Sequence, residues 1–172
     1  MMRKIAAVGA ALILLNVSTL YAQETSQDTM PPVLTEKAVA NFMKNHNELL
    51  SDLENFDNSM DHDSKTAEWF SAFENVVRTE PNALPSFLKK QPAPKKLQAL
   101  FKKHGLDGKT GMLQIIVIVY AVLSFEYGDA PVPLIIHPDD KKLIEKCSAE
   151  LQKLLRPKPF QTQDDVDSGD AQ

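Results

Sequence analysis

Hydrophobic residues recur at helical spacing through most of the chain, in six separate segments. Five of them place their apolar residues mainly three or four positions apart, which indicates a helix with one buried face. Prolines or polar runs separate the segments, because proline cannot continue a helix. The predicted helices span about 35–56, 65–79, 82–88, 95–104, 112–125 and 139–155.

The segment 112–125 differs from the others because it is apolar nearly all round. Its sequence is MLQIIVIVYAVLSF, in which Gln114 and Ser124 are the polar exceptions. A segment of this length is too short to span a bilayer, so we expect a buried central helix. Its β-branched residues also allow a buried strand. We favour the helix because the rest of the sequence shows no partner strand.

Together the segments predict an all-α fold. An amphipathic helix buries one stripe, whereas a helix that is apolar all round needs neighbours on every side. We therefore expect a small irregular or orthogonal bundle of five to six short helices around a buried central helix at about 111–126. The helical domain is assigned to 34–156. Gly105 followed by Leu106 predicts a left-handed glycine ending of the fourth helix, with Leu106 packing back on Phe101.

The N-terminus has the three parts of an export signal. Arg3 and Lys4 precede an apolar stretch at 5–17, and 18–22 forms a plausible cleavage region before Gln23. We predict a signal peptide at 1–22, a flexible leader at 23–33 and a disordered acidic tail at 157–172. No membrane span is expected after the signal. A single cysteine, Cys147, and no glycosylation sequon after residue 22 fit a bacterial periplasm better than a eukaryotic secretory route. We therefore expect the periplasm rather than the extracellular space.

Charge is distributed unevenly along the chain. Removing the signal takes the net charge from −4 to −6, because it carries two bases and no acid. Residues 36–80 carry 10 acids and 4 bases, whereas 89–109 carry seven lysines and one acid. The predicted partner-binding residues are Lys89, Lys90, Lys95, Lys96, Lys102 and Lys103. They indicate docking on an anionic protein or membrane surface, with a solvated helix face as the alternative. Export and the net negative charge argue against nucleic acid.

The polar break after the first helix resembles an EF-hand calcium loop in its spacing. Oxygen-bearing side chains occupy positions 1, 3, 5, 7 and 12 of such a loop: Asp57, Ser59, Asp61, Asp63 and Glu68. His62 stands at position 6, where the loop requires glycine for its sharp turn. The alternative is a solvated loop in which Asp63 or Ser64 caps the second helix. Calcium is the one candidate cofactor.

No catalytic set is recognisable from spacing. The four histidines stand in no metal-binding pair, and Cys147 falls on the apolar stripe of the last helix. The leading hypothesis is an exported, non-catalytic binding module for an envelope protein or an anionic surface. One alternative is a carrier of a small apolar ligand between helices, with Met43, Phe101, Met112 and Tyr120 as candidate lining residues. The other is an enzyme whose site the sequence does not reveal.

Overall fold

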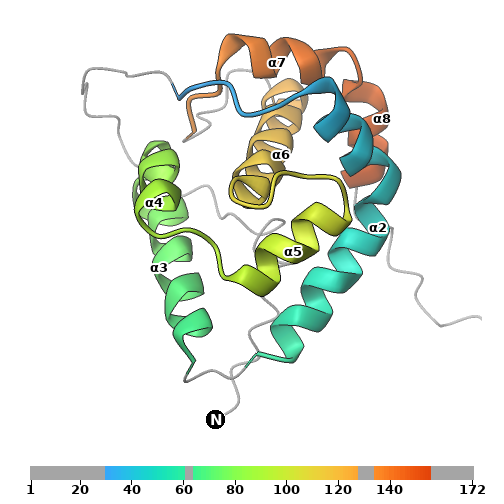
Figure 1. Ribbon diagram of the computed structural model, residues 1–172. Coiled ribbons are helices and arrows are strands. Elements are labelled where there is room, and N and C mark those ends of the chain that lie inside the picture. The colour runs from blue at the N-terminus through green and yellow to red at the C-terminus, as the bar shows by residue number, and fades with distance from the viewer. Residues whose placement is uncertain (1–29, 61–63, 128–133, 156–172) are drawn as a thin grey trace, which may run out of the picture.

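The computed structural model describes residues 30–60, 64–127 and 134–155. These residues form seven α-helices and one 3-10 turn, and they contain no strand, so the all-α prediction is confirmed. The signal peptide and the acidic tail that we predict lie outside the described residues. Figure 1 shows the arrangement of the helices. The elements are α2 (Glu36–Asn58), α3 (Lys65–Thr79), η1 (Pro81–Ala83), α4 (Leu84–Lys90), α5 (Lys95–Lys103), α6 (Gly111–Tyr127), α7 (Pro138–Glu145) and α8 (Ser148–Leu155).

α6 is the centre of the fold. Every residue from 111 to 122 is buried, so the helix has neighbours on all of its faces over this stretch. It packs most extensively against α7 and α8, and it also contacts α5 and α2. In Figure 1 it runs through the middle of the molecule, with α7 across its top. The expected central helix is therefore present, and it is a helix rather than a buried strand.

Local signals in the sequence set several helix ends. The Thr35 hydroxyl accepts a hydrogen bond from the Ala38 amide at 3.1 Å and caps α2. At the end of α5, Gly105 has φ +74°. The Leu106 amide donates to the Phe101 carbonyl at 3.0 Å, and the Gly105 amide donates to the Lys102 carbonyl at 3.0 Å. These two bonds form the Schellman ending that Gly105 predicts.

The hairpin of α3, η1 and α4 holds an aromatic cluster. α3 packs chiefly against η1 and α4. The Trp69 ring stacks on Phe73 at 5.1 Å between centroids and meets Phe70 edge-on at 5.2 Å. Phe87 of α4 closes the cluster, 6.0 Å from Trp69. These rings belong to the same buried cluster as α6, so side chains join the hairpin to the central helix.

The last predicted helix is two helices, which is why the described residues form seven α-helices rather than the five to six expected. The Cys147 amide donates to the Ile144 carbonyl at 3.0 Å, a three-residue return that tightens the chain at the end of α7. α8 then starts at Ser148. Ile144 and Leu151 are both fully buried, one on each side of the break. The spacing of the apolar residues continues unchanged across the turn between α7 and α8, so the sequence pattern does not reveal the break.

Two buried polar side chains fasten the chain just before α2. Asp140 is 0% exposed, and its two carboxylate oxygens accept from the Val33 amide at 3.0 Å and the Leu34 amide at 2.9 Å. The Gln114 amide nitrogen donates to the Val33 carbonyl at 2.9 Å. Met30 is buried as well. Residues 30–33, which the sequence assigns to the flexible leader, thus lie against the domain, whereas 23–29 lie outside the described residues.

Candidate functional site: the lysine face

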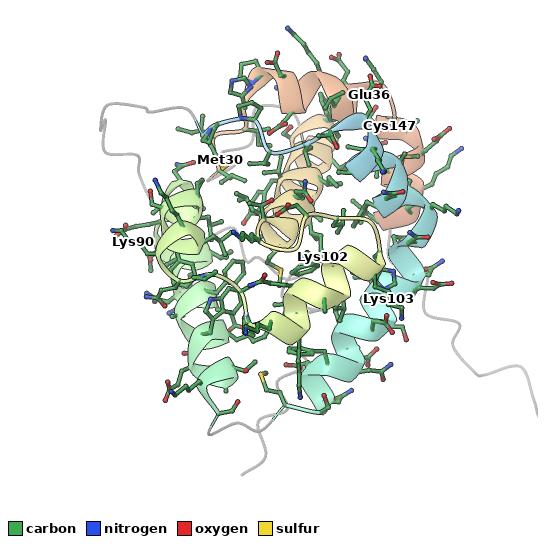
Figure 2. The ribbon with its side chains drawn as sticks, viewed as in Figure 1. Met30, Glu36, Lys90, Lys102, Lys103 and Cys147 are labelled. Carbon is green, nitrogen blue, oxygen red and sulfur yellow. The ribbon has the colours of Figure 1, made fainter. Side chains whose placement is uncertain are left out.

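The six predicted partner-binding lysines are all exposed, and we call them the lysine face. They come from three places: the end of α4, the start of α5 and the end of α5. Figure 2 shows Lys90 beside α4. It shows Lys102 and Lys103 at the C-terminal end of α5, the end farther from α4 along the chain. The members of the lysine face are Lys89, Lys90, Lys95, Lys96, Lys102 and Lys103.

Helical spacing aligns the lysines of α5 in two rows. Lys95 and Lys102 are seven residues apart, as are Lys96 and Lys103, so each pair shares one side of the helix. The opposite side of α5 carries Leu97 and Phe101, which are both 0% exposed. One helix therefore packs its apolar side into the core and presents four ammonium groups to solvent.

The connector between α4 and α5 is held in place at both ends. The Trp69 indole N–H donates to the Gln91 carbonyl at 2.9 Å, and the Gln98 side-chain amide donates to the Ala93 carbonyl at 2.6 Å. Ala93 is buried, with its neighbours Pro92 and Pro94 fixing φ on either side. These contacts fix the end of α4 relative to the start of α5, and with it the backbone that carries four of the lysines.

Lys103 is the member of the lysine face that has an acidic partner. Its Nζ lies 2.6 Å from Asp52 Oδ2 on α2, and His104 Nε2 lies 2.8 Å from the same oxygen. The hydrogen bonds from Lys103 and His104 lower the pKa of the Asp52 carboxyl, and the bond to Asp52 raises the pKa of Lys103. Across the described part of the chain, the other five lysines of the face form no ion pair.

An open polar depression lies beside this pair. It is lined by Asn47, Glu48, Ser51, Asp52 and Lys103. His104, which directly follows α5 and is 2% exposed, links α5 to α2 through its contact with Asp52. All five lining residues end in polar or charged groups, so the depression offers hydrogen bonds and charge to a ligand. The residues considered for an apolar ligand are elsewhere: Phe101, Met112 and Tyr120 are buried in the core, and Met43 is half-buried against it.

The Tyr120 hydroxyl is a buried polar group within α6. It has no hydrogen-bond partner in the described structure, and burial raises the pKa of the phenol. A buried hydroxyl without a partner lowers stability. The sequence gives no sign of this, since a tyrosine in an apolar run reads as an ordinary core residue.

The predicted calcium residues are only partly described. Asp61 and Asp63 lie outside the described residues. α2 extends through Asn58, two residues further than expected, so Asp57 lies in its last turn and Ser59 directly follows it. Residues two apart in a helix point about 200° apart. Asp57 and Ser59 could share one ion only if this turn unwound, and the calcium loop stays a prediction.

The remaining candidates for chemistry sit in structural positions. The Cys147 thiol is half-buried, 3.6 Å from the Leu143 carbonyl oxygen and 3.5 Å from that of Ile144. Burial raises its pKa, which disfavours the reactive thiolate. His46 is buried beside the Phe42 ring. Among the described residues, no group of three or more acids, histidines or cysteines is placed to hold a metal.

The chain matches no family model, no curated protein and no solved structure. No helix among the described residues is both long and apolar enough to cross a membrane. The case for the lysine face therefore depends on the structure of this chain alone. Its lysines are exposed, and hydrogen bonds hold the connector between the two helices that carry them.

Proposed function

We propose that this chain is an exported, non-catalytic helical domain that docks on an anionic partner through its lysine face. The observation that carries the proposal is the set of five exposed lysines on α4 and α5 that form no ion pair with any described residue. Charges of one sign on consecutive helices attract an anionic partner and steer its approach. The two hydrogen bonds that hold the connector between α4 and α5 support the proposal, because they fix the backbone that carries the lysines before a partner binds.

Three of the buried polar side chains support a non-catalytic role. Asp140 and Gln114 hold the segment before α2, and His104 joins α5 to α2. Each of these groups is engaged in fastening one element to another. In this proposal these three side chains stabilise the fold, and the surface lysines bind the partner.

Cation-exchange chromatography tests the proposal. The chain without its signal carries a net charge of −6, so a sulfonate resin repels the molecule on average and retains it only through a local cationic face. We expect retention of residues 23–172 at low ionic strength. A face variant, with Lys90, Lys95, Lys96 and Lys102 changed to Gln, is expected in the flow-through.

The control variant makes the same change of charge elsewhere. Lys37, Lys44, Lys65 and Lys153 are exposed, have no ion pair in the described structure and lie on α2, α3 and α8. Changing these four to Gln should leave retention near that of the wild type. Equal retention of the face and control variants would contradict the proposal.

A further inference from the structure

The residue types on the lysine face distinguish between kinds of anionic partner. Residues 89–109 contain seven lysines and no arginine. Protein–protein interfaces are enriched in arginine and aromatic residues and depleted in lysine, because arginine forms paired, directional hydrogen bonds with carboxylates. Ala99, between the lysine pairs of α5, is exposed and small. This face therefore lacks the anchors of a protein interface.

The packing of α5 determines how it could meet a bilayer. A basic amphipathic helix on a membrane normally buries its apolar side among the lipids. Here Leu97 and Phe101 are fully buried in the protein core, so that side is already occupied. Contact with a bilayer would be made by the lysines alone, without insertion.

The spread of the charges also favours a diffuse partner. The lysine pairs of α5 are seven residues apart, about 10 Å along the helix axis, and Lys89 and Lys90 lie beyond the connector. Lipids diffuse laterally and can gather under charges at any spacing, whereas the carboxylates of a folded protein stand at fixed positions. Each lysine near an anionic leaflet contributes on its own.

From residue type, packing and spacing we infer that the partner of the lysine face is a bilayer surface of anionic phospholipid, bound peripherally and without insertion. The inference rests on the proposed function and names its partner. Lys103 marks the edge of the contact, because Asp52 already holds its ammonium group at 2.6 Å. Lys102, next to it, forms no ion pair in the described structure, and its charge only helps to lower the pKa of the nearby Asp107 carboxyl.

Vesicle cosedimentation tests the inference with residues 23–172. The probes are vesicles of phosphatidylcholine alone and of phosphatidylcholine with about 30% phosphatidylglycerol. We expect binding to the anionic vesicles only, and weaker binding as the salt concentration is raised. One lysine near such a surface is worth about fivefold in affinity. Lys102→Gln should therefore weaken binding about fivefold, whereas Lys103→Gln should change it less.

The face and control variants separate the two proposals. The face variant should no longer sediment with anionic vesicles, while the control variant sediments as the wild type does. Wild-type chain that is retained by the sulfonate resin through the lysine face but ignores anionic vesicles would overturn the lipid inference and leave the docking function standing. Equal binding to both kinds of vesicle, or equal binding by the face and control variants, would also overturn it.

Discussion

Asp140 is a carboxylate without exposed surface, and it holds two consecutive backbone amides from a segment 106 and 107 residues earlier. Asp140→Asn would turn the donor NH2 group of the side-chain amide toward one of these backbone amides, so that neither of these two donors would have an acceptor. A buried donor that loses its acceptor costs about 1–3 kcal/mol. We expect a loss of that size in the free energy of unfolding, measured by urea denaturation.

The neighbouring residue provides the comparison. Asp139 is exposed on the same helix, and its ion pair with Lys142 lies at the surface at 3.8 Å. Asp139→Asn should change the free energy of unfolding by less than about 0.5 kcal/mol. If both variants behaved alike, the contact of Asp140 with residues 33 and 34 would contribute nothing to stability.

Asp52 predicts how stability depends on acidity. Hydrogen bonds from Lys103 and His104 lower the pKa of its carboxyl below the ordinary value of 3.8. A carboxyl with a lower pKa in the folded chain stabilises it above the unfolded pKa, and this contribution is lost as the pH falls through the folded value. We expect wild type to be more stable than Asp52→Asn above about pH 4, with the two converging on further acidification. Urea titrations at several pH values measure this, and a gap independent of pH would refute it.

At the scale of single residues, the sequence predicts what is local. Thr35 is recognisable as a cap because its partner Ala38 lies three residues away. In the sequence, Asp140 looks like an acidic residue in the first turn of a helix, where the helix dipole stabilises its charge. No neighbouring residue in the sequence indicates that it binds the backbone of residues 33 and 34. Gln114 carries a partial signal, since it interrupts an apolar run. Its partner Val33, 81 residues away, is visible only in the fold.

Among the elements, the end of α5 depends on Gly105. Its φ of +74° is unfavourable for other residues, and a Cβ there would collide with the side-chain amide of Asn41. We expect Gly105→Ala to lower the free energy of unfolding by about 1–3 kcal/mol, measured by urea denaturation.

A second substitution separates the two causes. Asn41→Gly removes the side chain that the new methyl group would meet, along with its hydrogen bond to the Gly105 carbonyl at 2.9 Å. Gly105→Ala should cost less in that background, because the backbone strain then remains without the collision. An unchanged cost would assign the whole effect to the backbone.

The sequence predicts the helices better than their lengths and breaks. Gly105 and Leu106 mark the end of α5 because a left-handed glycine leaves a distinct local pattern. The turn between α7 and α8 leaves no such pattern, because Ile144 and Leu151 are both buried at a spacing that also fits one continuous helix. The exposure of the six lysines of the lysine face could be predicted from their residue type, because a charged ammonium group is rarely buried. The pairing of Lys103 with Asp52 could not, since it requires α5 to lie beside α2.

For the molecule as a whole, we expect one cooperative unfolding transition. Trp69, the single tryptophan, reports on the α3–α4 hairpin, while far-ultraviolet circular dichroism reports on all the helices. The hairpin and α6 share one buried cluster, so neither should melt alone. Urea curves from fluorescence and dichroism should coincide. An earlier fluorescence transition would show that the hairpin is a separate folding unit.

The place of α6 in the chain sets the order of events during synthesis. Its neighbours α2 and α5 precede it, whereas α7 and α8 follow it. A growing chain therefore cannot bury α6 on all sides until α8 has been synthesised, as far as residue 155. Until then part of the apolar surface of α6 is exposed to water. Folding has to wait for nearly the whole polypeptide. For the exported chain that we propose, this delay leaves the polypeptide unfolded, and so able to pass through a transport channel, while its synthesis continues.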